Sequence, residues 1–268
     1  MGVVFGIGFV VGPTVSGLMN RYCGLRSPLL VAISFCMLSI VIVNRYIPSS
    51  STVNTSHQTE TSSASFDLQS FRRILSYPNV FQLLMVKNLA ITPLIVLTST
   101  LNLYLVDRYN LSPGLNSVLS IWIGVCIGFM DGVGVVWLRR RWEEPFLLRL
   151  GLLDLVATFG ALTLVTELWQ FPLIKPFLAL GIALVRVMTD SQIISQVPSN
   201  EHGTALSMSM TLNAIIRTVA PFLAGYMLQM IGFASFGMLG ILLCSCSLAV
   251  LQRVGPQLKS EQAQKKES

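Results

Sequence analysis

The sequence predicts an all-α, polytopic membrane protein, and three observations predict it. Of the 268 residues, 53% are hydrophobic and only 11% are charged, with a mean hydropathy of +0.68. A soluble globular protein carries about 25% charged residues. Uncharged runs such as Ser27–Asn44 are long enough for a helix to cross a bilayer. The third observation is a bent, glycine-rich helix that occurs twice in the chain, around Pro13 and Pro221.

The first of these helices covers Gly2–Met19. Gly8, Gly12 and Ser16 recur every fourth residue, so one helical face is a strip of small side chains. Such a strip lets a second helix approach closely, as helices do in lipid. Pro13 removes an amide donor and bends the helix. No basic region precedes this run and no cleavage site follows it, so we do not interpret it as a signal peptide.

A near copy lies far downstream. The segment 219–225 matches the segment 11–17 in residue type and spacing, with a proline at the same place and a glycine at the end of each. Internal repeats of this kind are typical of transporter folds. The residues to which we assign helix packing and gating in the two segments are Gly8, Gly12, Pro13, Gly17, Pro221 and Gly225.

Eight spans are expected in all. Ser27–Asn44 is the second. The segment 49–65 is rich in Ser and Thr, so we expect a disordered connector, followed by a short amphipathic helix at 66–75. The polar tail after Arg253 is also expected to be disordered. The other spans are expected at 80–106, 112–137, 146–167, 172–195, 203–230 and 233–251, with a break near Gly232.

The basic residues indicate the orientation. Arg72 and Arg73, Arg139–Arg141 and the Lys-rich tail would all lie on one side of the membrane, whereas few arginines flank the spans on the other. Cytosolic loops are enriched in Lys and Arg, so we assign the first side to the cytosol. The net charge of +6 has the same explanation, and no nucleic-acid partner is expected.

These features resemble the major facilitator superfamily. The fifth helix of its drug and metabolite antiporters carries the signature G-x-x-x-G-P-x-x-G-G, which Gly8, Gly12, Pro13 and Gly17 match, with Ser16 in place of a glycine. The family's G-x-L-A-D-R-x-G-R-R loop signature is degenerate here. Its first glycine and first arginine match at 134 and 139, but leucine replaces the acid and arginine replaces the second glycine.

The resemblance implies a major facilitator fold that lacks the first four helices. Residues 1–48 would be the last two helices of the N-terminal bundle, and 49–79 the cytosolic linker. Residues 80–252 would be the six-helix C-terminal bundle, and 253–268 a cytosolic tail. Phe66-Asp-Leu, Lys87, Thr189-Asp-Ser and Arg217-Thr-x-x-Pro more narrowly resemble organic-cation-transporter-like carriers, within the wider tetracycline-efflux-like group.

Four ionisable residues within the spans are candidates for a substrate or proton pathway, because such residues usually face a cavity or a partner. Arg186 and Asp190 are four apart on one helix, so we expect them to share a face and pair. Asp190 is our candidate for proton coupling or contact with a cation. A structural ion pair is the alternative. Lys87 either snorkels to the cytosol or faces the cavity. Arg217 either binds the carbonyl freed by Pro221 or faces the cavity.

Two further features lie in the presumed eighth and ninth helices. Gly124, Gly128 and Gly132 form a second strip of glycines beside Asp131. It is expected either to slide against the strip of the fifth helix or to pack there statically. Asp154 is expected to make a structural contact, since the resemblance places its helix at the periphery.

The function expected from the resemblance is secondary active transport of a small organic solute, an organic cation or a drug-like compound. It would be coupled to protons and work by alternating access in a plasma membrane or endomembrane. The alternative is a carrier fold that no longer transports and acts as a scaffold. No catalytic motif, metal-ligand spacing or cofactor motif occurs, and the five cysteines have no ligand spacing. We therefore expect no enzyme, no metal and no cofactor.

Overall fold

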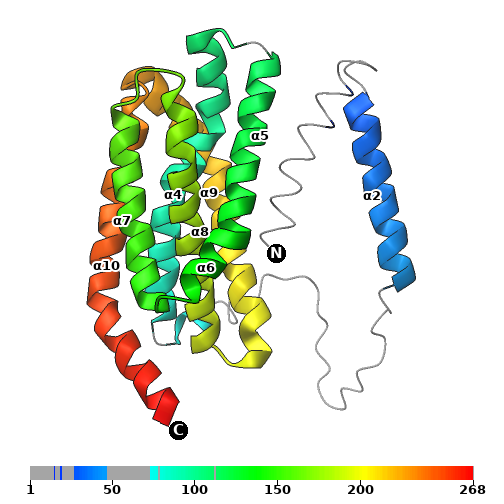
Figure 1. Cartoon of the computed structure of the whole chain (residues 1–268). Helices are drawn as coiled ribbons and strands as arrows, with labels where there is room; N and C mark the ends of the chain where they lie inside the picture. The colour runs from blue at the N-terminus through cyan, green and yellow to red at the C-terminus, as the bar shows by residue number, and fades with distance from the viewer. Residues whose placement is uncertain are drawn as a thin grey trace.

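The structure is a computed structural model that describes residues 27–46, 73–77, 79–111 and 113–267, together with Val15 and Met19. The expected first span, with Gly8, Gly12, Pro13 and Gly17, lies outside these residues except at those two positions. The connector 49–65 lies outside them as well. The second expected span coincides with helix α2 (Ser27–Tyr46), whose apolar part, Leu29–Arg45, is shorter than a membrane span requires; α2 lies apart from the other helices in Figure 1.

The part of the chain described from residue 79 onward is a bundle of six apolar helices, each long enough to cross a membrane (Figure 1). One of them contains a short π-helical turn, so that α5, η1 and α6 together form a single span. This confirms the six spans expected after the connector. The helices are α4 (Val80–Tyr109), α5 (Pro113–Phe129) with η1 (Met130–Gly134) and α6 (Val135–Arg139), α7 (Glu144–Thr163), α8 (Gln170–Gln196), α9 (His202–Met230) and α10 (Ala234–Glu267).

The helix boundaries follow local chemistry. Asn110 ends α4 in the left-handed region at φ 48°, which asparagine tolerates better than most residues. Gly232 has φ 90° and separates α9 from α10, which confirms the expected break. Pro93, Pro176 and Pro221 lie inside α4, α8 and α9, where each removes a backbone donor.

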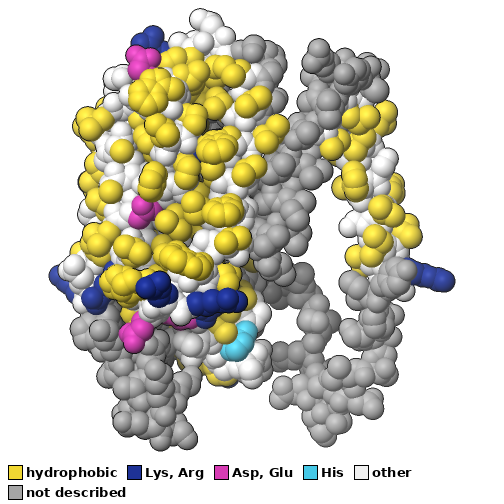
Figure 2. All heavy atoms as spheres, viewed as in Figure 1, with side chains coloured by type: hydrophobic (Ala, Val, Ile, Leu, Met, Phe, Trp, Pro, Cys, Tyr) yellow, Lys and Arg dark blue, Asp and Glu magenta, His cyan; other side chains and the backbone are white. Residues whose placement is uncertain are grey.

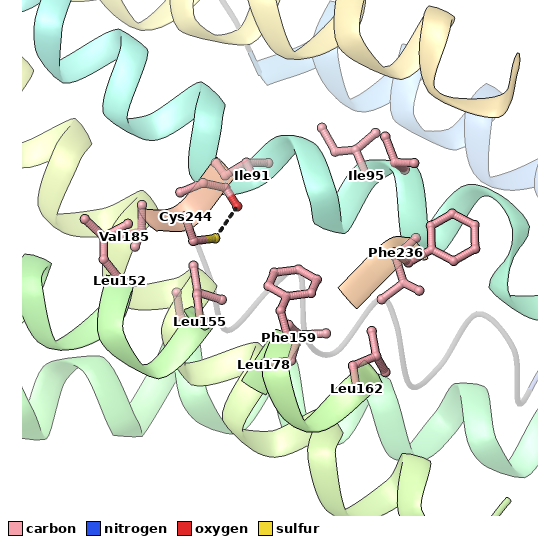
Figure 3. Close-up of a cluster of buried hydrophobic side chains, with 14 of the residues drawn as sticks. Ile91, Ile95, Leu152, Leu155, Phe159, Leu162, Leu178, Val185, Phe236 and Cys244 are labelled. Atoms are coloured by element: carbon pink, nitrogen blue, oxygen red, sulfur yellow. Dashed lines mark hydrogen bonds between the residues drawn. The ribbon is translucent and has the colours of Figure 1, made fainter. Parts of the chain in front are cut away.

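The core lies between α4, α7, α8 and α10. Figure 3 shows Phe159 of α7 and Phe236 of α10 among aliphatic side chains from α4 and α8. Packing between α7 and α10 is close because of two glycines. A Cβ added at Gly240 would come within 2.2 Å of the Phe159 ring, and one added at Gly237 within 2.3 Å of the Thr163 side chain. Small residues at helix contacts are the usual means of close packing in lipid.

A polar contact also joins α10 to α4. Ser247 Oγ donates a hydrogen bond of 2.9 Å to the Val86 carbonyl, and the Cys244 thiol lies 4.0 Å from the Ala90 carbonyl (Figure 3 shows the latter). Both serine and thiol are fully buried. A hydroxyl that bonds across two helices satisfies its own polarity without water, as the hydrocarbon region requires.

A smaller hydrophobic cluster lies at the other end of α4, where the linker enters the bundle. Ile74, in the helical turn 73–75, is 2% exposed and packs with Val80, Ile193 and Met208. Arg73 forms a 3.1 Å ion pair with Glu201, in the 3₁₀ turn η2 (Ser199–Glu201) before α9. The end of the linker is therefore attached to the α8–α9 connection.

The outer surface has the pattern of a membrane protein. Figure 2 shows a broad hydrophobic belt, with most Lys and Arg side chains gathered at one end of the bundle. The exposed apolar side chains on this bundle include Phe81, Leu103, Trp137, Leu153 and Phe177, each at least half exposed. An acidic side chain interrupts the belt at mid-height (Figure 2).

The expectation of a disordered tail is wrong. Helix α10 continues past Arg253 to Glu267. The tail was assigned from its polarity, but its residues are mostly Lys, Glu, Gln and Ala, which have high helix propensity. A polar composition therefore ends the membrane span here without ending the helix.

Candidate functional site

Three helices bring a buried lysine, an aspartate and a serine together. Lys87 of α4 donates hydrogen bonds from Nζ to Asp190 Oδ1 on α8 at 2.5 Å and to Ser209 Oγ on α9 at 2.8 Å. The lysine side chain is 5% exposed, and the aspartate side chain 27%. Charge-assisted hydrogen bonds of this kind are strong. We name Lys87, Asp190 and Ser209 the lysine cluster.

The expectation that Lys87 snorkels to the membrane surface is wrong. Its ammonium group turns inward, because Asp190 and Ser209 offer a charged and a polar acceptor inside the bundle. The alternative, that Lys87 faces the substrate cavity, stays a prediction.

The expected pairing of Arg186 with Asp190 is also wrong. Arg186 instead forms an ion pair with Asp131, in the π-helical turn η1. The Asp131 side chain is 3% exposed and that of Arg186 39% exposed. Residues four apart on a helix can pair, but here Arg186 and Asp190 each form an ion pair with a residue of a neighbouring helix. The π turn coincides with this site, as such turns often coincide with functional positions.

A third polar contact joins the C-terminal end of α6 to α7 and α8. Arg139 pairs with Glu144, and its Nη2 also donates to Ser191 Oγ at 3.1 Å. Ser191 in turn donates to Glu144 Oε1 at 3.0 Å. Arg139 was noted in the sequence only as part of a degenerate loop signature. The family's loop signature has an acid where this chain has Leu138. Here the negative charge beside Arg139 comes from Glu144 instead.

An apolar groove lies beside the lysine cluster, between α4 and α9. Its volume is about 350 Å³, within the range of small-molecule sites. Asn88 and Thr92 are its polar lining residues. Asn88 Nδ2 bonds the Leu84 carbonyl, which leaves Asn88 Oδ1 without a partner among the described residues. The apolar lining consists of Leu75, Phe81, Leu84, Met85, Leu89, Met208, Leu212, Ile215 and Ile216.

A polar stripe runs along α9 on one side of this groove. Ser209, Asn213 and Arg217 recur every fourth residue, so they lie on one helical face. Ser209 is buried against Lys87, Asn213 is half-buried, and Arg217 is exposed. No described residue hydrogen-bonds or forms an ion pair with the Arg217 guanidinium. The carbonyl freed by Pro221 therefore does not bind it, and the alternative that Arg217 faces the cavity stays a prediction.

Asp154 and the glycine strips lie elsewhere. Asp154 Oδ2 packs against Gly181 at the contact of α7 with α8, where an added Cβ would come within 2.6 Å of it. Gly124 is buried on α5 and Gly128 half-buried, but the π turn interrupts the α-helical register before Gly132. Gly225 has no atom within 4 Å of an added Cβ, so its face of α9 is open toward the described residues.

Sequence reasoning missed two partners of the candidate residues. Asp131 and Ser209 were not recognised as partners of Arg186 and Lys87. Gln192, two residues beyond Asp190, is 1% exposed and has neither side-chain polar atom bonded to a described residue. Buried polar groups normally have partners. The four-residue spacing of Ser209, Asn213 and Arg217 was the one signal in the sequence that could have indicated part of this set.

Comparisons with known proteins found a matching family profile and several related proteins. The family profile described as Major Facilitator Superfamily matches residues 1–216. The chain is 24% identical to "Solute carrier family 22 member 18" of Mus musculus over 98% of this chain and 66% of that protein. It is 25% identical to the protein of the same name from Rattus norvegicus, over 98% and 64%. It is 24% identical to "Solute carrier family 67 member A1" of Homo sapiens, over 94% and 61%.

The chain thus spans slightly less than two thirds of the length of the relatives it matches. The profile match covers most of the chain, and the six apolar helices have the arrangement of a multi-pass integral membrane protein. The chain therefore belongs to the Major Facilitator Superfamily.

Proposed function

We propose that the chain acts in secondary active transport of a small organic solute, an organic cation or a drug-like compound, coupled to protons. The observation that carries the proposal is the lysine cluster beside an apolar groove, in which a buried lysine of α4 binds an aspartate of α8 and a serine of α9. Charged groups at membrane depth are costly and mark substrate or proton pathways. The relatives named as solute carriers support the same role.

In this proposal Asp190 is the proton-coupling residue. Proton uptake by its carboxylate removes the negative charge that holds the Lys87 ammonium. The bond from Lys87 to Ser209 then remains as the link between α4 and α9. A change in the relative strength of these contacts shifts the balance between two arrangements of α4, α8 and α9. Protonation can shift such a balance only because one arrangement binds the proton better.

Alternating access completes the mechanism. The family's two bundles would rock about a site between them, with the glycine strips at their contact. Gly128 is half-buried on α5, and Gly12 lies outside the described residues. A bulky residue at either position should arrest transport while insertion into the membrane remains normal. Undiminished flux in such variants would refute the sliding of the strips.

The proposal is tested by reconstituting the chain in liposomes with a fluorescent pH indicator inside. Three probes share a dansyl group and differ in charge: a sulfonate (dansyl-taurine), a neutral hydroxyethyl amide and a trimethylammonium derivative. We expect an imposed pH gradient to accelerate uptake of at least one probe, together with proton flux. Asp190→Asn should abolish the proton flux, whereas the matched control Asp154→Asn should retain it.

Two outcomes would contradict the proposal. Equal loss of proton flux in Asp190→Asn and Asp154→Asn would remove Asp190 from its role. A folded chain that moves none of the probes, with or without a gradient, would favour the scaffold alternative. Chemical crosslinking of that chain in native membranes would then identify the proteins that it binds.

A further inference from the structure

Two exposed tryptophans flank three arginines where α6 ends. The segment 137–142 reads Trp-Leu-Arg-Arg-Arg-Trp, and α6 ends within it at Arg139. Trp137 is 61% exposed and Trp142 is 50% exposed. Tryptophan is enriched where a membrane meets water, at the level of the lipid headgroups. Figure 2 shows Lys and Arg side chains just below the hydrophobic belt at this end of the bundle. The segment therefore lies at headgroup level.

The turn between α6 and α7 is held in one conformation by short-range contacts. The backbone N–H groups of Arg141 and Trp142 both donate to the Leu138 carbonyl, at 3.0 Å each. The Trp142 ring stacks on Phe146, in the first turn of α7, with the ring centroids 4.8 Å apart and the planes at 21°. The arginines are therefore presented by an ordered turn with an apolar ring pair beside it.

Two of the three arginines are open to an outside anion. Arg139 pairs with Glu144. The side chains of Arg140 and Arg141 are exposed, and no described residue forms an ion pair with either. The exposed Glu143 lies next to them in the chain and is likewise in no ion pair with a described residue. It offsets part of their charge.

A further arginine reaches the same level from α7. Arg149 is half-buried, in no ion pair with a described residue, and about 7.5 Å along α7 from Glu144 at 1.5 Å per residue. Side chains on a helix tilt toward its N-terminus, so the Arg149 guanidinium extends toward the headgroups. It follows Phe146 by three residues, so the two are neighbours on the helix surface. We name residues 137–149 the arginine turn.

The composition of the arginine turn determines which ligand fits it. Besides the paired Arg139 and Glu144, three arginines and one glutamate leave a surplus of two positive charges. Guanidinium groups bind phosphate and carboxylate groups. A soluble anion would leave the exposed aromatic rings uncovered, whereas a phospholipid brings a charged headgroup for the arginines and acyl chains for the rings. The distribution of basic residues assigns this end to the cytosol, where anionic lipids are concentrated in the membrane leaflet.

We infer that the arginine turn binds an anionic phospholipid of the cytosolic leaflet. The guanidinium groups of Arg140, Arg141 and Arg149 donate hydrogen bonds to its phosphate and headgroup, and its acyl chains lie against Trp142 and Phe146. This site is separate from the lysine cluster, and it does not depend on the proposed transport. Because Arg139 directly precedes these arginines, the lipid lies beside the contact that joins α6 to α7 and α8.

The test measures lipid binding to the purified chain in detergent micelles by native mass spectrometry. The chain is titrated with palmitoyl-oleoyl phosphatidylserine and, separately, with phosphatidylcholine of the same acyl chains. We expect phosphatidylserine to bind at least tenfold more tightly. Arg140→Gln combined with Arg141→Gln should lower the phosphatidylserine affinity at least tenfold, since each arginine near a membrane surface contributes about fivefold. The phosphatidylcholine affinity should stay within twofold, which also reports that the variant is folded.

Three single variants test the position of the headgroup. Arg149→Gln should lower the phosphatidylserine affinity about fivefold. Glu143→Gln removes a negative charge beside the headgroup and should raise this affinity. Arg108→Gln, at an exposed arginine in the last turn of α4 and at the opposite end of the bundle, is the matched control and should leave it unchanged.

Four results would overturn the inference. Equal affinities for the two lipids would mean that the turn does not select a charged headgroup. Unchanged phosphatidylserine affinity in the double variant would place the lipid elsewhere on the chain. An equal loss in Arg108→Gln would reduce the effect to general attraction by positive charge. Displacement of phosphatidylserine by millimolar glycerophosphoserine, which has the headgroup but no acyl chains, would assign the turn to a soluble anion instead.

Discussion

Arg186 on α8 forms its ion pair with Asp131, 55 residues earlier in the π-helical turn after α5, and not with Asp190 one turn along its own helix. The two partners differ in environment, since the Asp131 side chain is 3% exposed and the Arg186 side chain 39%. The pair is therefore asymmetric. The buried Asp131 carboxylate needs the guanidinium to compensate its charge, whereas the guanidinium of Arg186 is partly exposed and needs the carboxylate less.

This asymmetry predicts unequal effects of the two single substitutions. Arg186→Gln leaves a buried carboxylate without its partner and should lower the free energy of unfolding by about 3 kcal/mol. Asp131→Asn leaves a guanidinium whose side chain is 39% exposed, and it should lower the free energy of unfolding by less than Arg186→Gln does. Unfolding by sodium dodecyl sulfate in mixed micelles measures both. A larger loss of unfolding free energy for Asp131→Asn than for Arg186→Gln would contradict this order.

Lys87 and Asp190 should behave as an energetic unit. Removing either partner alone, by Lys87→Met or Asp190→Asn, strands a charge in the bundle and should cost about 3–5 kcal/mol. The double variant should lose less than the sum of the two by about 1 kcal/mol or more. Lys87→Met combined with Asp154→Asn is the control pair, and its effects should add. Additivity in both pairs would argue against a direct bond between Lys87 and Asp190.

Substitution by alanine should affect stability differently at Gly240 of α10 and at Gly225 of α9. Gly240→Ala forces a Cβ into the Phe159 ring, 2.2 Å away, and should destabilise the bundle by about 1–3 kcal/mol. Gly225→Ala meets no atom within 4 Å and should be neutral in the same unfolding assay. Combining Gly240→Ala with Phe159→Leu should restore part of the loss. Failure of that rescue would place the strain elsewhere.

The bond from Ser247 to the Val86 carbonyl should be measurable. Interhelical hydrogen bonds in membranes contribute about 0.6 kcal/mol on average and up to about 1.7. Ser247→Ala should therefore reduce stability by about that amount. Ser207→Ala, which removes an exposed hydroxyl bonded within its own helix, should have no effect on stability. An equal effect of the two would indicate that the α10–α4 bond contributes nothing.

The end of the linker should be held by packing more than by charge. Ile74→Ala opens a cavity in the small cluster at the base of α4 and should cost about 2–4 kcal/mol. Arg73→Gln removes an ion pair whose arginine side chain is 70% exposed and should cost less than about 1 kcal/mol. Limited proteolysis of the linker and unfolding curves would show the difference. Greater release of the linker by Arg73→Gln would contradict this order.

The features that could be predicted from the sequence depend only on residues that are close together in the chain. The six spans of the bundle follow from runs of apolar residues, and the break at Gly232 follows from one glycine. Asp190, Lys87 and Arg217 stood out because charge within an apolar run is rare. The choice of partners was not predictable in this way. It depends on how far each helix is rotated about its axis, and residues 55 or 103 positions apart decide it.

The π turn shows the same limit. The sequence of Met130–Gly134 carries no signal for a π-helical turn, so a continuous strip of glycines was expected there. The turn shifts the register before Gly132 and places Asp131 against Arg186. The tail shows the converse error, because polarity was taken as disorder although the helix propensity of its residues carries α10 onward to Glu267.

The inward-facing Lys87 constrains how the chain can be made. A ribosome adds Asp190 103 residues after this lysine, so α4 reaches the insertion machinery long before its acidic partner exists. An unpaired lysine raises the free energy of helix insertion, by about 2.5–3.5 kcal/mol at the centre of a span and by less toward its ends, and Lys87 lies in the second turn of α4. During synthesis α4 must therefore either keep the ammonium near the aqueous edge or wait beside the translocon until α8 arrives. Assembly of this bundle is thus a late event, completed only when its second half has been translated.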